Sequence, residues 1–153
     1  MFPTTRITLD GIEIPVKKPS NPRLQQLTWS SYKNRNTVKS VPGVTPGGLV
    51  LWIPPASGGH CCDRLFVERG TLNRLVEPKD SIMVDKGFDI QDLFVPRVVN
   101  IPTFLKSGTQ FHASELERDR KIASKCVHVE RIIGFAKTFK ILERPINHIG
   151  CCQ

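Results

Sequence analysis

The chain has 153 residues, of which 39% are hydrophobic and 24% charged, values that are ordinary for one soluble globular domain with its own core. No apolar run approaches the roughly 20 residues that a membrane span needs, and the N-terminus lacks the pattern of a secretory signal peptide, so we expect an intracellular protein or a fragment. The formal net charge of +8, from 22 basic and 14 acidic residues, is compatible with a polyanionic partner and favours nucleic acid over a membrane surface.

Cysteine usage argues against a disulfide framework. The five cysteines are odd in number and include two adjacent pairs, and no secretory signal precedes them. Histidines lie near them, but no CxxC or HxxxH spacing is present, so reduced thiols are the default and a zinc site is the minor alternative. The residues concerned are Cys61, Cys62, Cys126, Cys151 and Cys152, with His60, His128 and His148.

The first half of the chain predicts strands separated by turns. Residues 6–16 predict either a strand pair or one long bent strand, because Asp10-Gly11 suits both a hairpin turn and a strand end that carries an acid. A short helix is expected around residues 24–27. Residues 37–44 and 49–53 predict an antiparallel hairpin, since the TPGG sequence between them is typical of a turn.

The second half alternates helices with short strands. Residues 63–76 predict a helix that Asp63 caps, and the apolar run at residues 81–84 predicts a strand buried on both faces. The other expected segments are a helical turn at 89–94, a strand at 98–102, an irregular stretch at 105–112 and a helix at 114–142 with a break near 123–125.

The last helix carries one apolar stripe with Glu130 beside it. The stripe consists of Ile122, Cys126, Val129, Ile133 and Ala136, at helical spacing. Gly134 follows Glu130 by one turn and shares its face. Considered alone, Glu130 is most simply a surface residue paired with Arg131 or Lys137.

This order of elements predicts an α/β layer fold with a mixed five-stranded sheet flanked by helices. We expect one domain at residues 1–145 and an unstructured tail at 146–153.

Three acids could meet in such a fold. Asp10 interrupts the first strand, Asp85 follows the buried strand and Glu130 lies on the late helix. Two carboxylates about 4 Å apart repel by roughly 4 kcal/mol at an effective dielectric near 20, so three need a cation. Lys86 supplies one charge at most, whereas Mg²⁺ or Mn²⁺ suits a set of carboxylate oxygens.

Several motifs together resemble the DDE-type transposases of the PIF/Harbinger group. They are LDGIEIPVKKPSNP at 9–22, SSYKNRNTVK at 30–39, VTPGGLV at 44–50, SIMVDKGF at 81–88 and RDRKIASKCVHVERIIGFAKTFKIL at 118–142. The resemblance implies a ribonuclease-H-like fold in which Asp10, Asp85 and Glu130 are the catalytic acids and hold two Mg²⁺ or Mn²⁺ ions that act on a DNA phosphodiester. Such domains often follow a zinc-binding THAP module, and this chain contains none.

The resemblance also suggests residues of lesser weight. Asp63 is a candidate accessory acid near the metals, although a helix cap is the favoured role. Basic residues are candidates for contacts with the DNA backbone, against the alternative of solvated strand and helix faces. These candidates are Lys33, Arg35, Lys39, Arg118, Lys121 and Lys125.

Two functional hypotheses follow. The first is a metal-dependent DNA endonuclease core derived from a transposase, located in the nucleus, with DNA as its partner and a DNA-binding module that is separate or missing. The second is a domesticated, catalytically inactive module that binds DNA or protein. The segment at 106–116 looks divergent from the family, which supports the second hypothesis. An oligomer is compatible with either.

Overall fold

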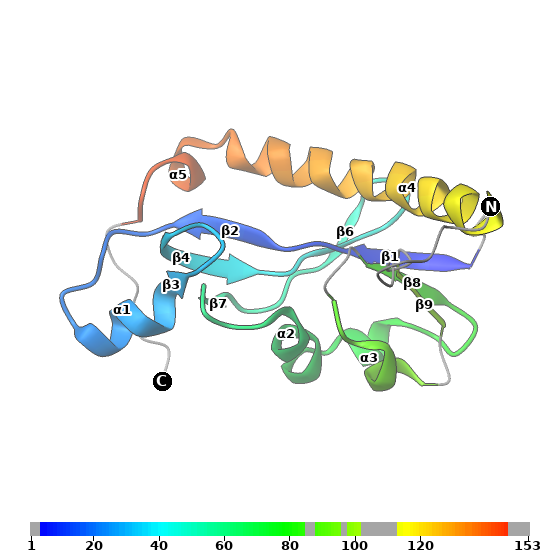
Figure 1. Ribbon diagram of the computed structural model, residues 1–153, viewed down its shortest axis with the longest axis horizontal. Helices are drawn as coiled ribbons and strands as arrows, with labels where there is room; N and C mark the ends of the chain where they lie inside the picture. Colours follow the sequence, from blue (N-terminus) through cyan, green and yellow to red (C-terminus); the bar gives the residue numbers. More distant parts are fainter. Residues whose placement is uncertain (1–3, 85–87, 96–97, 102–112, 147–153) are drawn as a thin grey trace.

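The computed structural model describes residues 4–84, 88–95, 98–101 and 113–146, and it shows a mixed α/β fold (Figure 1). The strands are β1 (Thr5–Leu9), β2 (Ile12–Pro15), β3 (Trp29–Ser30), β4 (Arg35–Ser40), β5 (Gly43–Val44), β6 (Val50–Trp52), β7 (Ser57–Gly58), β8 (Ser81–Val84) and β9 (Val98–Asn100). The helices are α1 (Pro22–Thr28), α2 (Asp63–Arg69), α3 (Leu72–Leu75), α4 (Ala113–Lys137), α5 (Lys140–Glu143) and the 3-10 helix η1 (Gln91–Phe94).

The main sheet has five strands, as predicted, and their order is β6-β5-β1-β8-β9. β1, β8 and β9 run parallel to one another, whereas β5 and β6 are antiparallel to their neighbours, so the sheet is mixed. All four residues of β8 are buried, which confirms the prediction for this apolar run.

β1 and β2 behave as one long bent strand that changes sheets. β1 belongs to the main sheet, whereas β2 pairs with β4 in a second, four-stranded sheet that also contains β3 and β7. The break between them falls at Asp10-Gly11. The hairpin alternative is therefore wrong, because β1 and β2 do not pair with each other. The sequence did not predict the second sheet.

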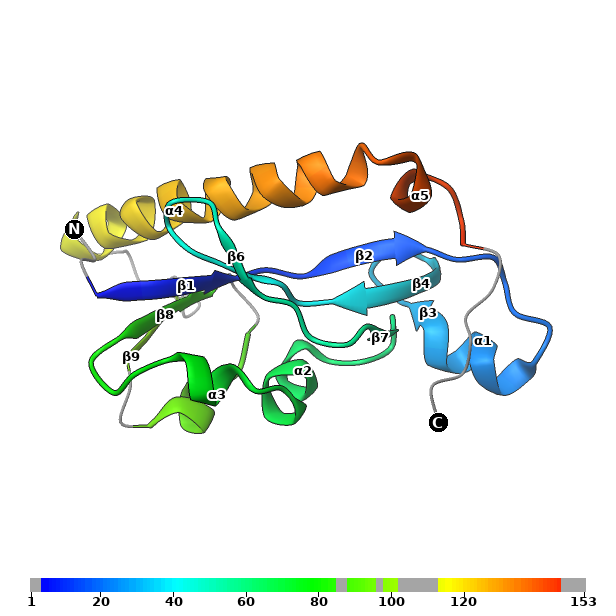
Figure 2. The ribbon, with the colours of Figure 1, turned by 180° about the vertical axis from the view of Figure 1, so that it is seen from behind.

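Helices cover both faces of the main sheet (Figure 2). α2 and α3 bury Phe66, Val67 and Leu72 in a core cluster with side chains of β1 and β8. On the other face, α4 buries Val129 and Ile133 in a second cluster with residues of β2 and β5. The predicted stripe of α4 is thereby confirmed as its packing face.

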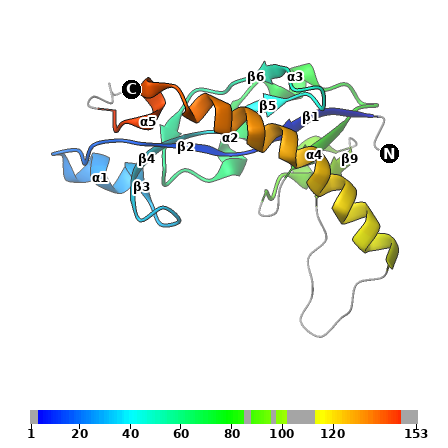
Figure 3. The ribbon, with the colours of Figure 1, turned by 90° about the horizontal axis from the view of Figure 1, so that it is seen from above.

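Two helix boundaries differ from the sequence prediction. The helix expected at 63–76 is divided at Gly70, where the backbone is extended (φ −83°, ψ 167°), and a Cβ at this position would overlap the Trp52 ring and the carbonyl of Phe66. α4 continues through 123–125 without the expected break and ends at Lys137, from where the chain turns into α5 (Figure 3).

The TPGG turn joins β5 and β6 as predicted. Gly48 has φ +94°, which an L side chain rarely adopts, and its N–H donates to the carbonyl of Thr45 at 2.9 Å. The turn lies against α4, since a Cβ on Gly48 would be 3.6 Å from Cδ1 of Ile132.

Near the end of the described chain, Ile146, which the sequence assigned to the tail, forms a parallel bridge with Val16.

None of the helices in the described ranges is both long and apolar enough to cross a membrane.

Candidate active site

The ends of β1 and β8 lie side by side, and an aspartate follows each of them in the chain. Leu9 and Val84 are partners in the parallel pair of β1 with β8. Asp10 follows Leu9, and Asp85 follows Val84 in the chain but lies outside the described residues. The carboxyl ends of parallel neighbours share one edge of a sheet, so this register favours a site at that edge.

Asp10 is half-buried at this edge, and one of its oxygens is oriented locally. The N–H of Gly11 donates to Oδ1 of Asp10 at 2.7 Å. This hydrogen bond restricts the rotation of the carboxyl group, so Asp10 offers an oxygen ligand of defined orientation.

Glu130 lies on α4, where the helix packs over β2 and β5. Its neighbour Val129 is buried in the cluster that contains Ile12, two residues after Asp10. The Glu130 side chain is exposed, and within the described part of the chain it forms no ion pair or hydrogen bond. The expected pairing with Arg131 or Lys137 is therefore not observed.

The space one turn beyond Glu130 is open. A Cβ on Gly134 would meet no atom within 4 Å. The glycine thus leaves this face of α4 accessible, as the sequence suggested, although no packing contact requires a glycine there.

Asp63 is close to Asp10-Gly11, and it does not cap α2. The N-cap is Cys62, which makes no side-chain capping bond, so the favoured cap role for Asp63 is wrong. Oδ1 of Asp63 lies 2.8 Å from Nζ of Lys39 and 3.7 Å from the position of a Cβ on Gly11. This oxygen is sealed from solvent and makes no hydrogen bond of regular geometry in the part of the chain described, so the Lys39 charge is its compensation.

Lys39 differs in environment from the other basic candidates. Its side chain is only 15% exposed, and it points at Asp63 rather than into open solvent. Lys33 and Arg35 are exposed on the β3–β4 hairpin, and Lys33 lies over the Tyr32 ring with its Nζ 4.8 Å from the centroid. The pairing of Lys39 with Asp63 was not evident from sequence, because the two residues are 24 positions apart and the three strands β5, β6 and β7 lie between them.

The basic candidates of α4 are only partly available for DNA. Lys121 is exposed but pairs with Glu117 at 2.7 Å, one helical turn away. Arg118 is exposed, and nothing is described of the side chain of Lys125. Arg118 is thus the better placed of the described α4 candidates.

The described residues include no three His, Cys, Asp or Glu side chains grouped to hold a metal ion. Asp85 lies outside them, so this finding does not test the proposed triad. For the thiols, burial raises the pKa of Cys61, with a smaller contribution from the neighbouring Cys62.

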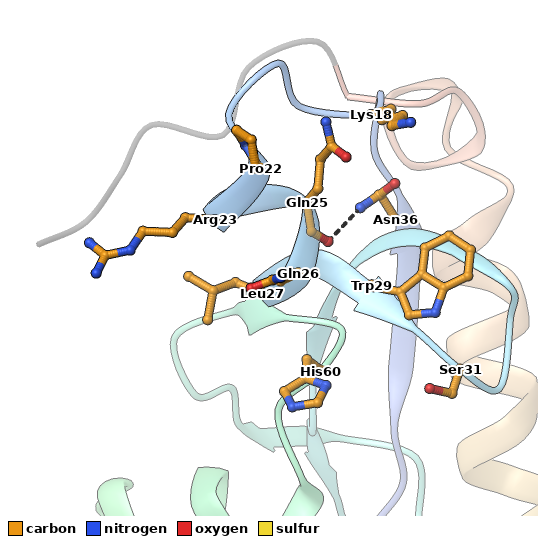
Figure 4. Close-up of a pocket in the computed structure, with 10 residues that line it drawn as sticks. All are labelled: Lys18, Pro22, Arg23, Gln25, Gln26, Leu27, Trp29, Ser31, Asn36 and His60. Carbon is orange, nitrogen blue, oxygen red and sulfur yellow. Dashed lines mark hydrogen bonds between the residues drawn. The ribbon is translucent and has the colours of Figure 1, made fainter.

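A pocket of about 1040 Å³ lies at the far end of the second sheet (Figure 4). Side chains from α1, β3, β4 and the loop after β7 line it. Sequence reasoning did not find this pocket, because four separate segments contribute to it. The sequence signal that could have indicated it is a tryptophan, Trp29, which follows the amides Gln25 and Gln26 and precedes the basic residue Lys33.

Comparison with known proteins gives one match. A protein-family model described as DDE superfamily endonuclease matches residues 9–150, a range that includes Asp10, Asp85 and Glu130. No curated protein and no solved structure matches the chain.

Proposed function

Because the chain belongs to the DDE superfamily of endonucleases, we propose that it cleaves DNA phosphodiester bonds at a divalent-metal site formed by Asp10, Asp85 and Glu130. The observation that carries the proposal is the register of β1 with β8, in which Leu9 pairs with Val84. Each proposed aspartate directly follows one of these two residues. We further propose a ribonuclease-H-like fold, a PIF/Harbinger origin and a nuclear location.

The donor chemistry fits Mg²⁺ or Mn²⁺. Carboxylate oxygens are the ligands that these ions prefer. Asp10 offers an oriented carboxylate, and Glu130 offers one with no partner in the described part of the chain. Lys39 already balances Asp63, so a divalent ion would serve the other three acids.

A bound pair of divalent ions would polarise the phosphodiester and stabilise the charge that develops on the attacking and leaving oxygens. The residues of the chain prepare for this. Gly11 holds the Asp10 carboxylate through its N–H, and the Lys39–Asp63 ion pair beside it keeps the Lys39 side chain in a fixed position against Gly11. Exposed Lys33 and Arg35 would hold the backbone of the DNA.

The test is nicking of supercoiled plasmid by purified protein in Mg²⁺ or Mn²⁺. We expect Asp10→Asn, Asp85→Asn and Glu130→Gln each to lower the rate by more than about 100-fold, above the roughly 10- to 100-fold typical of residues that only support a metal ligand. Glu117→Gln is the matched control for Glu130, because it removes another exposed carboxylate of α4. If Asp85→Asn nicks DNA as fast as the parent, the proposed mechanism is wrong.

The second candidate is a DNA- or protein-binding module without catalysis. It is favoured by the segment between Glu13 and Asp63, which contains six basic and no acidic residues and forms the pocket. This candidate predicts salt-sensitive binding with no cleavage and no stabilisation by metal. A rise in melting temperature with Mn²⁺ that is lost in Asp10→Ala would argue against it.

A further inference from the structure

We propose that the pocket beside Trp29 binds one unpaired nucleotide of the DNA strand that passes the acidic site. This inference rests on the proposed function and adds a binding subsite to it. Three observations carry it, namely an exposed indole on a rigid wall, unpaired positive charge and polar side chains without partners.

The stacking surface is Trp29. Its side chain is 43% exposed, although its backbone is fixed by pairing with Asn36 across β3 and β4. Asn36 is itself anchored, because its Nδ2 donates to the carbonyl of Gln25 at 3.0 Å and to Oγ1 of Thr28 at 2.8 Å. The indole therefore rests on a preformed wall, and stacking there requires little ordering of the protein.

The helix that forms the other wall is also fixed at its start. Oδ1 of Asn21 accepts a hydrogen bond from the N–H of Arg23 at 2.9 Å, and Pro22 occupies the first helical position. The Gln25 side chain bonds the carbonyl of Pro19 at 2.7 Å, which ties the preceding loop to α1. The pocket is thus bounded by elements with their own local supports.

The charge of the pocket is positive and uncompensated. Among its lining residues the charged ones are Lys18 and Arg23, and in the described part of the chain neither forms an ion pair. The neighbouring chain offers no acid either, since none occurs between Glu13 and Asp63. This arrangement favours an anionic ligand such as a phosphate and disfavours a cationic ligand.

Polar groups remain for a base edge. The side chains of Gln26, Ser31 and His60 line the pocket and make no hydrogen bond to the described part of the protein. Both hydrogens of Asn36 Nδ2 are already used, so Asn36 serves the wall and not the ligand. The volume of about 1040 Å³ is slightly above the usual range of ligand pockets, roughly 300–1,000 Å³, and accommodates a nucleotide with its flanking phosphates.

The position relative to the acids fits one DNA strand. Asn36 precedes Lys39 by three residues on β4, a span of about 10 Å, and Lys39 lies against Gly11, with its Cε 3.6 Å from the position of a Cβ there. The pocket therefore lies on the order of 10 Å along β4 from the residue that packs against Gly11, next to the end of β1. Only an unpaired base can offer its face to Trp29, because a paired base is stacked within the duplex.

The experiment compares two labelled DNAs of the same sequence without divalent metal, a blunt duplex and a duplex with a single-stranded overhang. We expect Trp29→Ala to weaken binding of the overhang DNA by about 5- to 100-fold and to leave blunt-duplex binding unchanged. Trp29→Phe should retain part of the preference. Tyr32→Ala is the matched control, since it removes an 84% exposed aromatic side chain from the same hairpin but outside the pocket.

Intrinsic fluorescence supplies an independent readout. The chain has two tryptophans, and Trp52 is only 6% exposed, so the difference between parent and Trp29→Phe spectra reports Trp29. We expect the overhang DNA to quench this difference signal at saturation. The inference is overturned if no quenching occurs, if Trp29→Ala weakens both DNAs equally, or if Tyr32→Ala has the same effect as Trp29→Ala.

Failure of this inference is distinguishable from failure of the nuclease proposal. Metal-dependent nicking that is lost in Asp10→Asn, with no contribution of Trp29 to overhang binding, overturns the pocket alone. Overhang binding that depends on Trp29, with no nicking in any metal, overturns the nuclease and retains the pocket.

Discussion

At the scale of single residues, the ion pair between Asp63 and Lys39 lies beside Gly11, at the edge of the proposed site. Both side chains are largely buried, with exposed fractions of 25% and 15%. A buried charge that loses its partner costs more than an exposed pair contributes, because the remaining group stays out of water.

We therefore predict that Asp63→Ala lowers the free energy of unfolding by about 1–3 kcal/mol. Urea denaturation measures this change. Glu117→Ala is the control, since it removes one partner of an exposed i,i+4 pair, for which we expect about 0.3–0.5 kcal/mol. Equal costs for the two variants would show that the Asp63–Lys39 pair is no stronger than a surface pair.

The residues of the site differ in how far sequence could identify them. Asp10 and Glu130 are candidates from motif context, and the structure places Asp10 between β1 and β2 and Glu130 on α4. Their distance from each other is set by the packing of α4, which no local pattern specifies. The approach of Asp63 to Gly11 depends on how α2 packs against the strands, so sequence suggested only a cap.

At the scale of elements, Arg64 joins α2 to η1. Its guanidinium donates to both carboxylate oxygens of Asp92, at 2.7 and 2.6 Å, and to the carbonyl of Asp89 at 3.0 Å. The Arg64 hydrogen bonds hold the pKa of Asp92 below the ordinary value near 3.8. A lowered carboxyl pKa in the folded state stabilises the fold above the unfolded pKa, and this contribution is lost as the pH falls through the folded pKa.

We predict that Asp92→Asn lowers the melting temperature at about pH 7 and that the gap to the parent closes as the pH falls below about 3.8. Thermal melts across this range measure the gap. Asp89→Asn is a suitable control, because Arg64 contacts the carbonyl of Asp89 and makes no described contact with its side chain. A gap of constant size at every pH would mean that Asp92 does not act through its charge.

Elements with a strong local pattern were predicted well. The apolar run of β8, the TPGG hairpin and the stripe of α4 each depend on features that lie within a few residues. The division of α2 from α3 was missed, because the apolar spacing of residues 63–76 continues across Gly70, where the backbone is extended. The second sheet was missed for a similar reason, since β2 continues β1 in sequence but pairs with β4.

At the scale of the whole molecule, one long segment of the chain carries basic residues and no acid. The segment from Glu13 to Asp63 encloses six basic residues and no acid between them, and it builds α1, β3 and β4 at one end of the fold (Figure 1). β1 and β8 lie toward the other end, and Asp10 falls at the junction of the two sheets.

The most direct measurement is the anomalous scattering of Mn²⁺ in crystals of the protein. We predict a Mn²⁺ peak about 2 Å from a carboxylate oxygen of Asp10, with Asp85 and Glu130 as the other ligands of the site. We predict that this peak is lost in Asp10→Asn crystals. A peak that persists in Asp10→Asn would place the metal elsewhere. A Glu130 carboxylate more than roughly 10 Å from both aspartates in the Mn²⁺ crystals would contradict the shared site, because oxygen ligands of one metal cluster cannot span that distance.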